Sequence, residues 1–184
     1  STLSRYPEVF TLEEQEIDEN TVWPLLERTI RGAAVQVGES RQKEGGHIKK
    51  DLNEKLDVML SYVDFIEERS PEIMRDYREK LEAKVTELLG DTSMDEARIA
   101  TEVTIFSDKI CVDEEIVRLR SHIKNMEEEL RKGGCIGRKL DFIAQEMNRE
   151  ANTILSKAND LETSNCAISL KTDIEKVREQ IQNI

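Results

Sequence analysis

Apolar side chains recur every three or four residues along most of this chain, and that spacing constrains its fold more than any other feature. The clearest run consists of Ile48, Leu52, Leu56, Met59, Val63 and Ile66. Such spacing places every member on one side of an α-helix. Only 8 glycines and 3 prolines occur among 184 residues, and aromatic residues make up 4%. This composition favours long amphipathic helices over sheets, so we expect an all-α fold.

The N-terminal half should contain long helices and an antiparallel helical hairpin. Thr21 is placed to cap a helix whose apolar stripe includes Trp23 and Ile30. Gly45 and Gly46 interrupt the pattern, which is compatible either with a break or with a continuous helix. Ser70–Pro71 resembles a new helix start, so segments 48–66 and 73–88 are expected to form the hairpin.

The C-terminal half should form a helical bundle. Helices are expected to start at Asp95 and at Asp113, with Asp113 as an N-cap, and the second should end at the glycines 133–134. Segment 137–157 and the heptad run 170–184 supply two more. We therefore predict an extended linker at 1–20, long helices with a hairpin at 21–90, and a C-terminal helical domain at 91–184.

Charge and cysteine content exclude several classes of protein. The net charge of −12 should repel nucleic acid and anionic membranes from the chain as a whole. Cys111, Cys135 and Cys166 are too far apart for a zinc site and odd in number, which favours a reducing cytoplasm. No apolar run approaches the ~20 residues of a membrane span.

The segment 131–157 departs from the acidic character of the chain. It holds six cationic and three anionic side chains. Local segregation of this kind can attract phosphate groups even on an acidic protein. The alternative is a helix terminus with ordinary surface lysines, and charge alone leaves both interpretations open.

Within that segment, Glu146 and Glu150 stand one helical turn apart, and Lys157 continues the same face. Two such carboxylates can share Mg²⁺ or Mn²⁺, which supports phosphodiester hydrolysis by Lewis-acid chemistry. Intrahelical salt bridges with Arg149 are the structural alternative. In the preceding helix Glu115, Arg118 and His122 also share one face. There His122 is either a general acid or base, or a partner of a neighbouring carboxylate.

These motifs resemble a known family. The stretches "GRKLDFIAQEMNREANTILSKAND", "KTDIEKVREQIQNI", "DEEIVRLRSHI", "RQKEGGHIKKDL" and "YPEVF" are similar to blocks of the YicC-like endoribonucleases. The resemblance implies a bacterial, cytoplasmic, metal-dependent enzyme that cuts single-stranded or structured RNA and assembles as a ring-like hexamer. It also implies an N-terminal α/β domain ahead of the segment that this chain matches, and without that domain we expect weak or no activity.

The resemblance also implies functional residues, to which we assign roles. The catalytic set is His122, Asp141, Glu146 and Glu150, and the metal set is Asp141, Glu146 and Glu150. The RNA-binding set is Arg118, Arg138, Lys139, Arg149, Asn152, Ser156 and Lys157. Arg178, Glu179 and Gln180 match the closing block, where packing or assembly is an equally good role.

Two other functions compete with RNA cleavage. In the first, the chain is a non-catalytic adaptor that binds RNA, oligomerises and recruits another nuclease, and the polar block forms contacts between subunits. In the second, it is a coiled-coil assembly module, as the repeats at 48–66 and 170–184 suggest. Dependence of cleavage on a divalent metal separates the enzyme from the adaptor.

Overall fold

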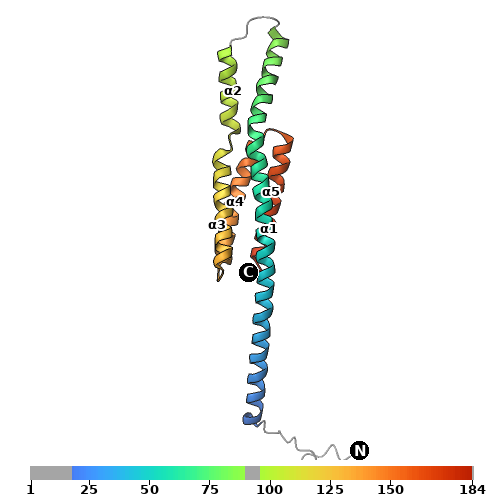
Figure 1. Ribbon diagram of the computed structural model, residues 1–184, viewed down its shortest axis with the longest axis vertical. Coiled ribbons are helices and arrows are strands. Elements are labelled where there is room, and N and C mark those ends of the chain that lie inside the picture. The colour runs from blue at the N-terminus through green and yellow to red at the C-terminus, as the bar shows by residue number, and fades with distance from the viewer. Residues whose placement is uncertain (1–17, 90–95, 184) are drawn as a thin grey trace, which may run out of the picture. The chain divides into compact units, whose positions relative to one another are not determined.

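A computed structural model describes residues 18–89 and 96–183 (Figure 1). Within these ranges all regular structure is helical: α1 spans Glu19–Leu89, α2 Glu96–Ile110, α3 Asp113–Lys132, α4 Gly137–Lys157 and α5 Leu161–Ile181. The predicted all-α fold is therefore confirmed. Most of the predicted linker and the helix start expected at Asp95 lie outside the described residues. The predicted division into three segments stays a prediction.

The chain separates into two units, residues 1–44 and 45–184, and α1 contributes to both. In the first unit the apolar stripe faces solvent, since Trp23 is 62% exposed and Ile30 58%. The cap predicted at Thr21 was wrong. Asp18 holds the helix start instead, because its carboxylate accepts from the Asn20 amide at 3.1 Å and from the Thr21 hydroxyl. Both hydrogen bonds lower the pKa of Asp18, and the bond from Thr21 has the larger effect.

Helix α1 passes without interruption through Gly45–Gly46 and through Ser70–Pro71. The predicted restart at Ser70, and the hairpin between 48–66 and 73–88, were therefore wrong. An interior proline removes one backbone hydrogen bond, but contacts on both sides of it hold this helix together. Ile66 is buried, and Arg69 pairs with Glu72 at 2.5 Å and with Glu162 at 3.4 Å.

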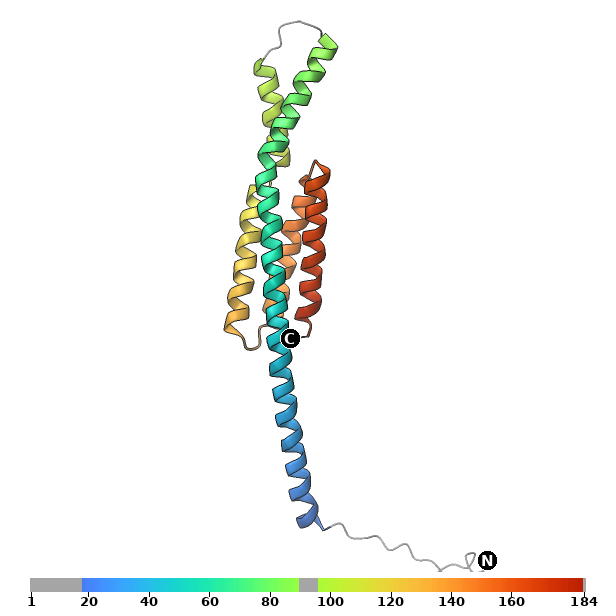
Figure 2. The ribbon, with the colours of Figure 1, turned by 45° about the vertical axis from the view of Figure 1, so that its right-hand side comes forward.

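The antiparallel hairpin is formed instead by the last part of α1 and by α2. Figure 2 shows α2 running beside that part of α1. The rings of Tyr77 and Phe106 stack with centroids 3.6 Å apart, and Ile99 and Ile110 are buried. The two helices thus pack through apolar side chains spaced three or four residues apart. Such side chains form ridges on one helix that fit into grooves of the other.

Helices α3, α4 and α5 pack with residues 48–66 of α1 around a common core (Figure 1). The core residues are at most 9% exposed, and those predicted from the repeats include Leu52, Leu56, Met59, Val63, Leu119, Ile123, Met126, Leu140, Met147, Ile154, Leu170, Ile174 and Val177. Burial of each large side chain stabilises the fold by about 1.5–3 kcal/mol. The heptad stripe of the last helix therefore finds its partners within this chain.

The turns around α3 and α4 set the register of the bundle. Gly133 and Gly134, at φ 68° and 85°, occupy backbone conformations that other residues rarely adopt, and they end α3 as predicted. The cap predicted at Asp113 was wrong, since α3 begins at Asp113 and no side chain caps it. Val112, buried in the core, fixes that junction by packing, while Asp113 favours the helix start through the helix dipole.

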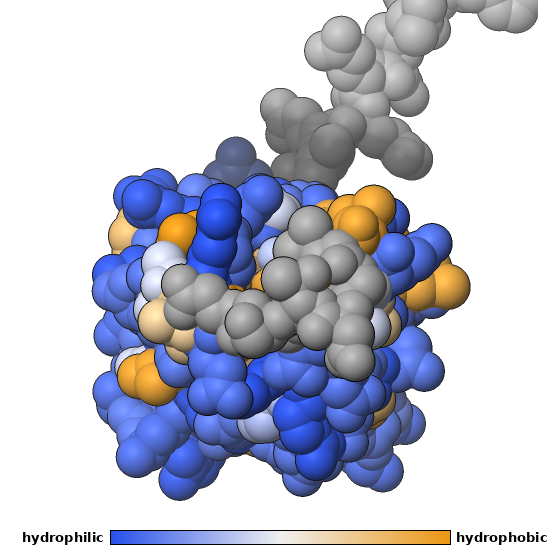
Figure 3. All heavy atoms as spheres, turned by 90° about the horizontal axis from the view of Figure 1, so that it is seen from above, coloured by the Kyte–Doolittle hydropathy of each residue, from blue (hydrophilic) through white to orange (hydrophobic). Residues whose placement is uncertain are grey.

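The surface matches the charged composition. Seen from above (Figure 3), the visible face is mostly hydrophilic, and its hydrophobic side chains lie in small separate groups. Over the described residues, no helix combines the length and apolar character that crossing a membrane requires.

Candidate functional site

Helix α4 carries most of the predicted site residues and presents four different sides. Its position is set by the glycine turn from α3 and by the start of α5, where Asp160 accepts the Glu162 and Thr163 amides at 3.0 Å each. Burial raises the pKa of Asp160, but hydrogen bonds from Thr163 and Glu162 and the charge of Arg69 outweigh burial and lower it. One side of α4 enters the core, one faces α3, one faces α5 and one faces solvent.

The side of α4 that faces α3 is joined to it by three ion pairs, which we call the α3–α4 seam. Lys157 lies 2.8 Å from Glu115, Arg118 lies 3.9 Å from Glu150, and Lys139 lies 3.0 Å from Glu129. The seam residues are Glu115, Arg118 and Glu129 of α3 with Lys139, Glu150 and Lys157 of α4. The seam contains three buried carboxylates, each opposed by a cation from the facing helix.

Glu115 and Lys157 form the most enclosed pair. The Lys157 ammonium donates to Glu115 Oε1 at 2.8 Å and to the Cys111 carbonyl at 2.9 Å. The second oxygen of Glu115 is buried without a hydrogen-bond partner among the described residues. We did not predict Glu115 as a site residue, although its spacing from Arg118 placed it on the same face. Lys157, predicted to bind RNA, is thus held by a buried carboxylate.

Glu150 is 5% exposed, and its ionic partner among the described residues, Arg118, lies 3.9 Å away, beyond hydrogen-bond reach. The Arg118 guanidinium donates instead to Glu114, one turn earlier on its own helix. A buried carboxylate whose charge is only loosely compensated is able to attract a further cation.

His122 and Glu146 occupy the next position along the seam. The ion pairs Arg118–Glu150 and Glu129–Lys139 define an antiparallel register between α3 and α4. His122 follows Arg118 by four residues on α3, and Glu146 precedes Glu150 by four residues on α4, so the two occupy matching positions in that register. Both side chains are half-buried, and Glu146 lies 4.0 Å from Arg149. The structure therefore brings three of the four predicted catalytic residues, His122, Glu146 and Glu150, to one seam.

Asp141 lies on the side of α4 that faces α5. Its carboxylate accepts from Arg178 at 3.3 Å and from the Gln145 amide at 2.7 Å. Five residues separate Asp141 from Glu146, which rotates the two side chains by about 140° around the helix. In ranges 18–89 and 96–183, no three His, Cys, Asp or Glu side chains are grouped to hold a metal ion. Asp141 therefore lies on a different side of α4 from Glu146 and Glu150. The predicted metal set of these three residues stays a prediction.

The side of α4 that faces solvent is free of carboxylates, and we call it the outer stripe. Its members, all exposed, are Arg138, Phe142, Gln145, Arg149, Asn152 and Ser156. At 100° per residue they fall within about 80° of arc. Four of the predicted RNA-binding residues, Arg138, Arg149, Asn152 and Ser156, thus share one face. Phe142 was not predicted, although its spacing from Arg138 and Arg149 gave the signal.

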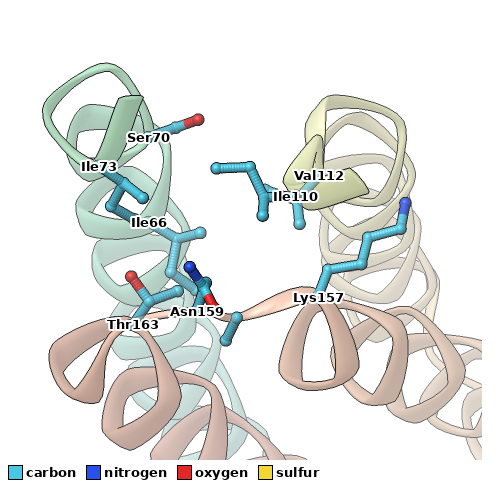
Figure 4. Close-up of a pocket in the computed structure, with 9 residues that line it drawn as sticks. Ile66, Ser70, Ile73, Ile110, Val112, Lys157, Asn159 and Thr163 are labelled. Carbon is cyan, nitrogen blue, oxygen red and sulfur yellow. The ribbon is translucent and has the colours of Figure 1, made fainter. Parts of the chain in front are cut away.

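A small pocket lies at the end of the seam (Figure 4). Ile66, Val112, Asn159 and Thr163 line it, and Lys157 reaches past it toward the start of α3. Its volume of about 20 Å³ accommodates one water molecule. This pocket is too small for a nucleotide.

Comparison with known proteins agrees with the resemblance seen in the motifs. A model of the C-terminal part of YicC-like endoribonucleases matches residues 66–184. The protein named probable endoribonuclease YicC of Clostridioides difficile is 42% identical over 183 residues, which are 99% of this chain and 62% of that protein. The protein of the same name in Haemophilus influenzae is 33% identical over 180 residues, which are 98% of this chain and 61% of that protein.

The chain thus spans about 60% of the length of these relatives. The matched segment includes α2, α3, α4 and α5, and with them the seam and the outer stripe. Because the family model matches residues 66–184, more than half of the sequence, this chain belongs to the YicC-like endoribonuclease family.

Proposed function

We propose that this chain is the RNA-engaging helical part of an endoribonuclease that hydrolyses phosphodiester bonds in the bacterial cytoplasm. The single observation that carries the proposal is the loosely compensated Glu150 carboxylate, buried in the seam beside the carboxylate-free outer stripe. RNA bound along the stripe would bring its backbone to the rim of the seam. The relatives' name, endoribonuclease, agrees with this chemistry.

The proposed site has distinct roles for its residues. Glu146 and Glu150 supply oxygen ligands of the kind that Mg²⁺ and Mn²⁺ prefer, and their spacing of one turn fits a shared ion. When bound, such an ion supplies Lewis-acid stabilisation of phosphate charge. Arg118 and Arg149 contact phosphate oxygens, and His122 holds or transfers the proton of the reacting oxygen. Glu115 holds Lys157 at the end of the seam.

The test is RNA cleavage by a protein of the relatives' full length. Glu146→Gln and Glu150→Gln keep the side-chain size and remove the charge, so cleavage with Mn²⁺ should fall at least about a hundredfold, because each variant weakens the proposed metal site. Glu128→Gln, at an exposed position of α3, is the matched control and should cleave normally. Cleavage by both seam variants at the wild-type rate would rule out this site.

The adaptor remains the second candidate because the cross-helix ion pairs also suit a purely structural seam. Highly purified protein whose RNA cleavage is absent, or is indifferent to EDTA, while RNA binding persists would favour the adaptor. Cleavage that EDTA abolishes and Mn²⁺ restores would favour the enzyme.

We also propose that the protein assembles from several copies, as the hexamer of the family implies. The support is the exposed apolar stripe of the first unit, where Trp23, Leu26 and Ile30 are 62%, 47% and 58% exposed. Several large apolar side chains exposed on one face of a helix are typical of an interaction surface. Analytical ultracentrifugation should find an oligomer that Ile30→Glu dissociates, whereas a monomeric wild-type protein at high concentration would contradict the proposal.

A further inference from the structure

Phe142 is the one aromatic side chain on the outer stripe, and its setting there is unusual for a single exposed apolar residue. It is 62% exposed and stands four residues after Arg138 and seven before Arg149, which is itself 75% exposed. At 1.5 Å per residue the two arginines lie about 16 Å apart along the helix, with Phe142 between them. Single exposed apolar side chains need no explanation in general, but this one lies between two cations.

We propose that Phe142 stacks on an unpaired base of RNA while Arg138 and Arg149 contact the flanking phosphates. This inference rests on the proposed function and adds to it a residue that binds an unpaired base. Charge complementarity selects the ligand, since the stripe carries two arginines and no carboxylate in a chain of net charge −12. An exposed ring between cations is the arrangement that binds single strands through stacking and backbone contacts.

Geometry favours unpaired over double-stranded RNA. The major groove of an A-form duplex is too narrow and deep for side chains to read, and stacked bases present no free face to a ring. A single-stranded segment presents both a base face and its Watson–Crick edge. The ring of Phe142, carried on the exposed side of a rigid helix, is accessible to such a base.

Gln145 adds a hydrogen-bonding group beside the ring, and Asp141 positions it. The Gln145 amide nitrogen donates to Asp141 at 2.7 Å, and Asp141 is in turn held by Arg178 at 3.3 Å. Because the amide nitrogen is engaged, the amide oxygen of Gln145 remains as an acceptor for an amino group of the stacked base. This gives Asp141 a positioning role that agrees with its placement away from the seam.

The test uses the 184-residue chain with a short unpaired oligoribonucleotide that carries 2-aminopurine, and with a hairpin duplex. Phe142→Leu keeps an apolar side chain without a ring, Phe142→Trp keeps a ring, and Val117→Ala changes an apolar residue of α3 that is 67% exposed. Circular dichroism checks that each variant folds.

We expect Phe142→Leu to weaken binding of the unpaired RNA about tenfold, or ~1.4 kcal/mol, as loss of one base–aromatic stack does. It should also abolish quenching of 2-aminopurine, while Phe142→Trp retains both and neither variant changes duplex binding. Val117→Ala should bind as the wild type does.

Three results would overturn the stacking proposal. Unchanged affinity of Phe142→Leu alongside weakened binding by Arg149→Ala would leave the proposed RNA function standing without the stack. A change in sedimentation caused by Phe142→Leu would assign the ring to a contact between copies. Absence of RNA binding by the wild-type chain, both unpaired and duplex, would remove the RNA interface on this chain together with the stack.

Discussion

The two charged sides of α4 differ in how their cations are used. On the α3–α4 seam, Lys139 and Lys157 are each paired with a buried glutamate of the facing helix. On the outer stripe, Arg138 and Arg149 are exposed, and the ion pair of Arg149 within the described part of the chain is a 4.0 Å contact with Glu146. The cationic excess of segment 131–157 is therefore divided between holding the helices together and facing solvent. Local charge counted along a sequence overstates what is available to a ligand.

The largest effect should come from breaking the enclosed pair of the seam. Lys157→Met leaves the Glu115 carboxylate buried without its partner, and we expect a loss of about 2 kcal/mol in the free energy of unfolding. Adding Glu115→Gln should recover part of that loss, because the uncompensated charge is then gone. Urea denaturation followed by circular dichroism measures both. Arg149→Met on the outer stripe is the matched control, with a change below ~0.5 kcal/mol. Equal losses for the two variants would break the comparison.

On the outer stripe, the effect should appear in binding and leave stability unchanged. Arg149→Ala should weaken binding of unpaired RNA about fivefold and reduce the slope of log affinity against log salt by about 0.7, the share of one phosphate contact. Fluorescence anisotropy at several salt concentrations measures both. Lys124→Ala, at an exposed position of α3, is the control and should change neither. An unchanged salt slope for Arg149→Ala would mean that Arg149 contacts no phosphate.

Acid should weaken the seam and spare the outer stripe. Hydrogen bonds from Lys132 and Lys139 lower the pKa of Glu129 below its ordinary value. A lowered pKa in the folded state means that Glu129 contributes stability above the unfolded glutamate pKa, and that this contribution is lost as pH falls through the lower, folded value. Unfolding free energies measured from pH 7 to pH 3 should therefore fall less steeply for Glu129→Gln than for the wild type. The outer stripe contains no carboxylate. Identical slopes would argue against the pairing.

The smallest effect is expected at the end of the outer stripe. The Ser156 hydroxyl donates to the Thr153 carbonyl of its own helix at 2.8 Å, a bond that contributes little to stability. Ser156→Ala should change the free energy of unfolding by less than ~0.5 kcal/mol and RNA affinity by less than about twofold. Denaturation and anisotropy titrations check these values. A loss of affinity comparable to that of Arg149→Ala would extend the RNA contact to the end of α4.

Much of the bundle was predictable, because its helices are defined by local periodicity. The core positions Leu56, Leu119, Met147 and Ile174 follow from the repeats alone. The Ser70–Pro71 restart was wrong because a strong local signal for a helix start was outweighed by packing and ion pairs contributed by α5, about ninety residues away. Local propensity predicts element boundaries poorly where tertiary contacts oppose it.

The candidate site was predictable only in part for the same reason. Spacing of one turn placed Glu146 and Glu150 on one side of α4, as the structure confirms. It gave no information on the pairing of Lys157 with Glu115, 42 residues apart, or of Arg178 with Asp141, 37 residues apart. Phe142 was missed because its availability to a ligand depends on its exposure, which the sequence does not give.

The segments 19–44 and 48–66 show where sequence information ends. Both carry apolar stripes at helical spacing, and both lie in α1. In the second, Leu52, Leu56 and Met59 are completely buried, whereas in the first Trp23 and Ile30 are more than half exposed. Periodicity determines which side of a helix is apolar, because side-chain direction depends only on local backbone geometry. Which helix covers that side was decided by the tertiary structure, because burial depends on residues distant in the chain, brought together by the turns at Gly133–Gly134 and Asp160.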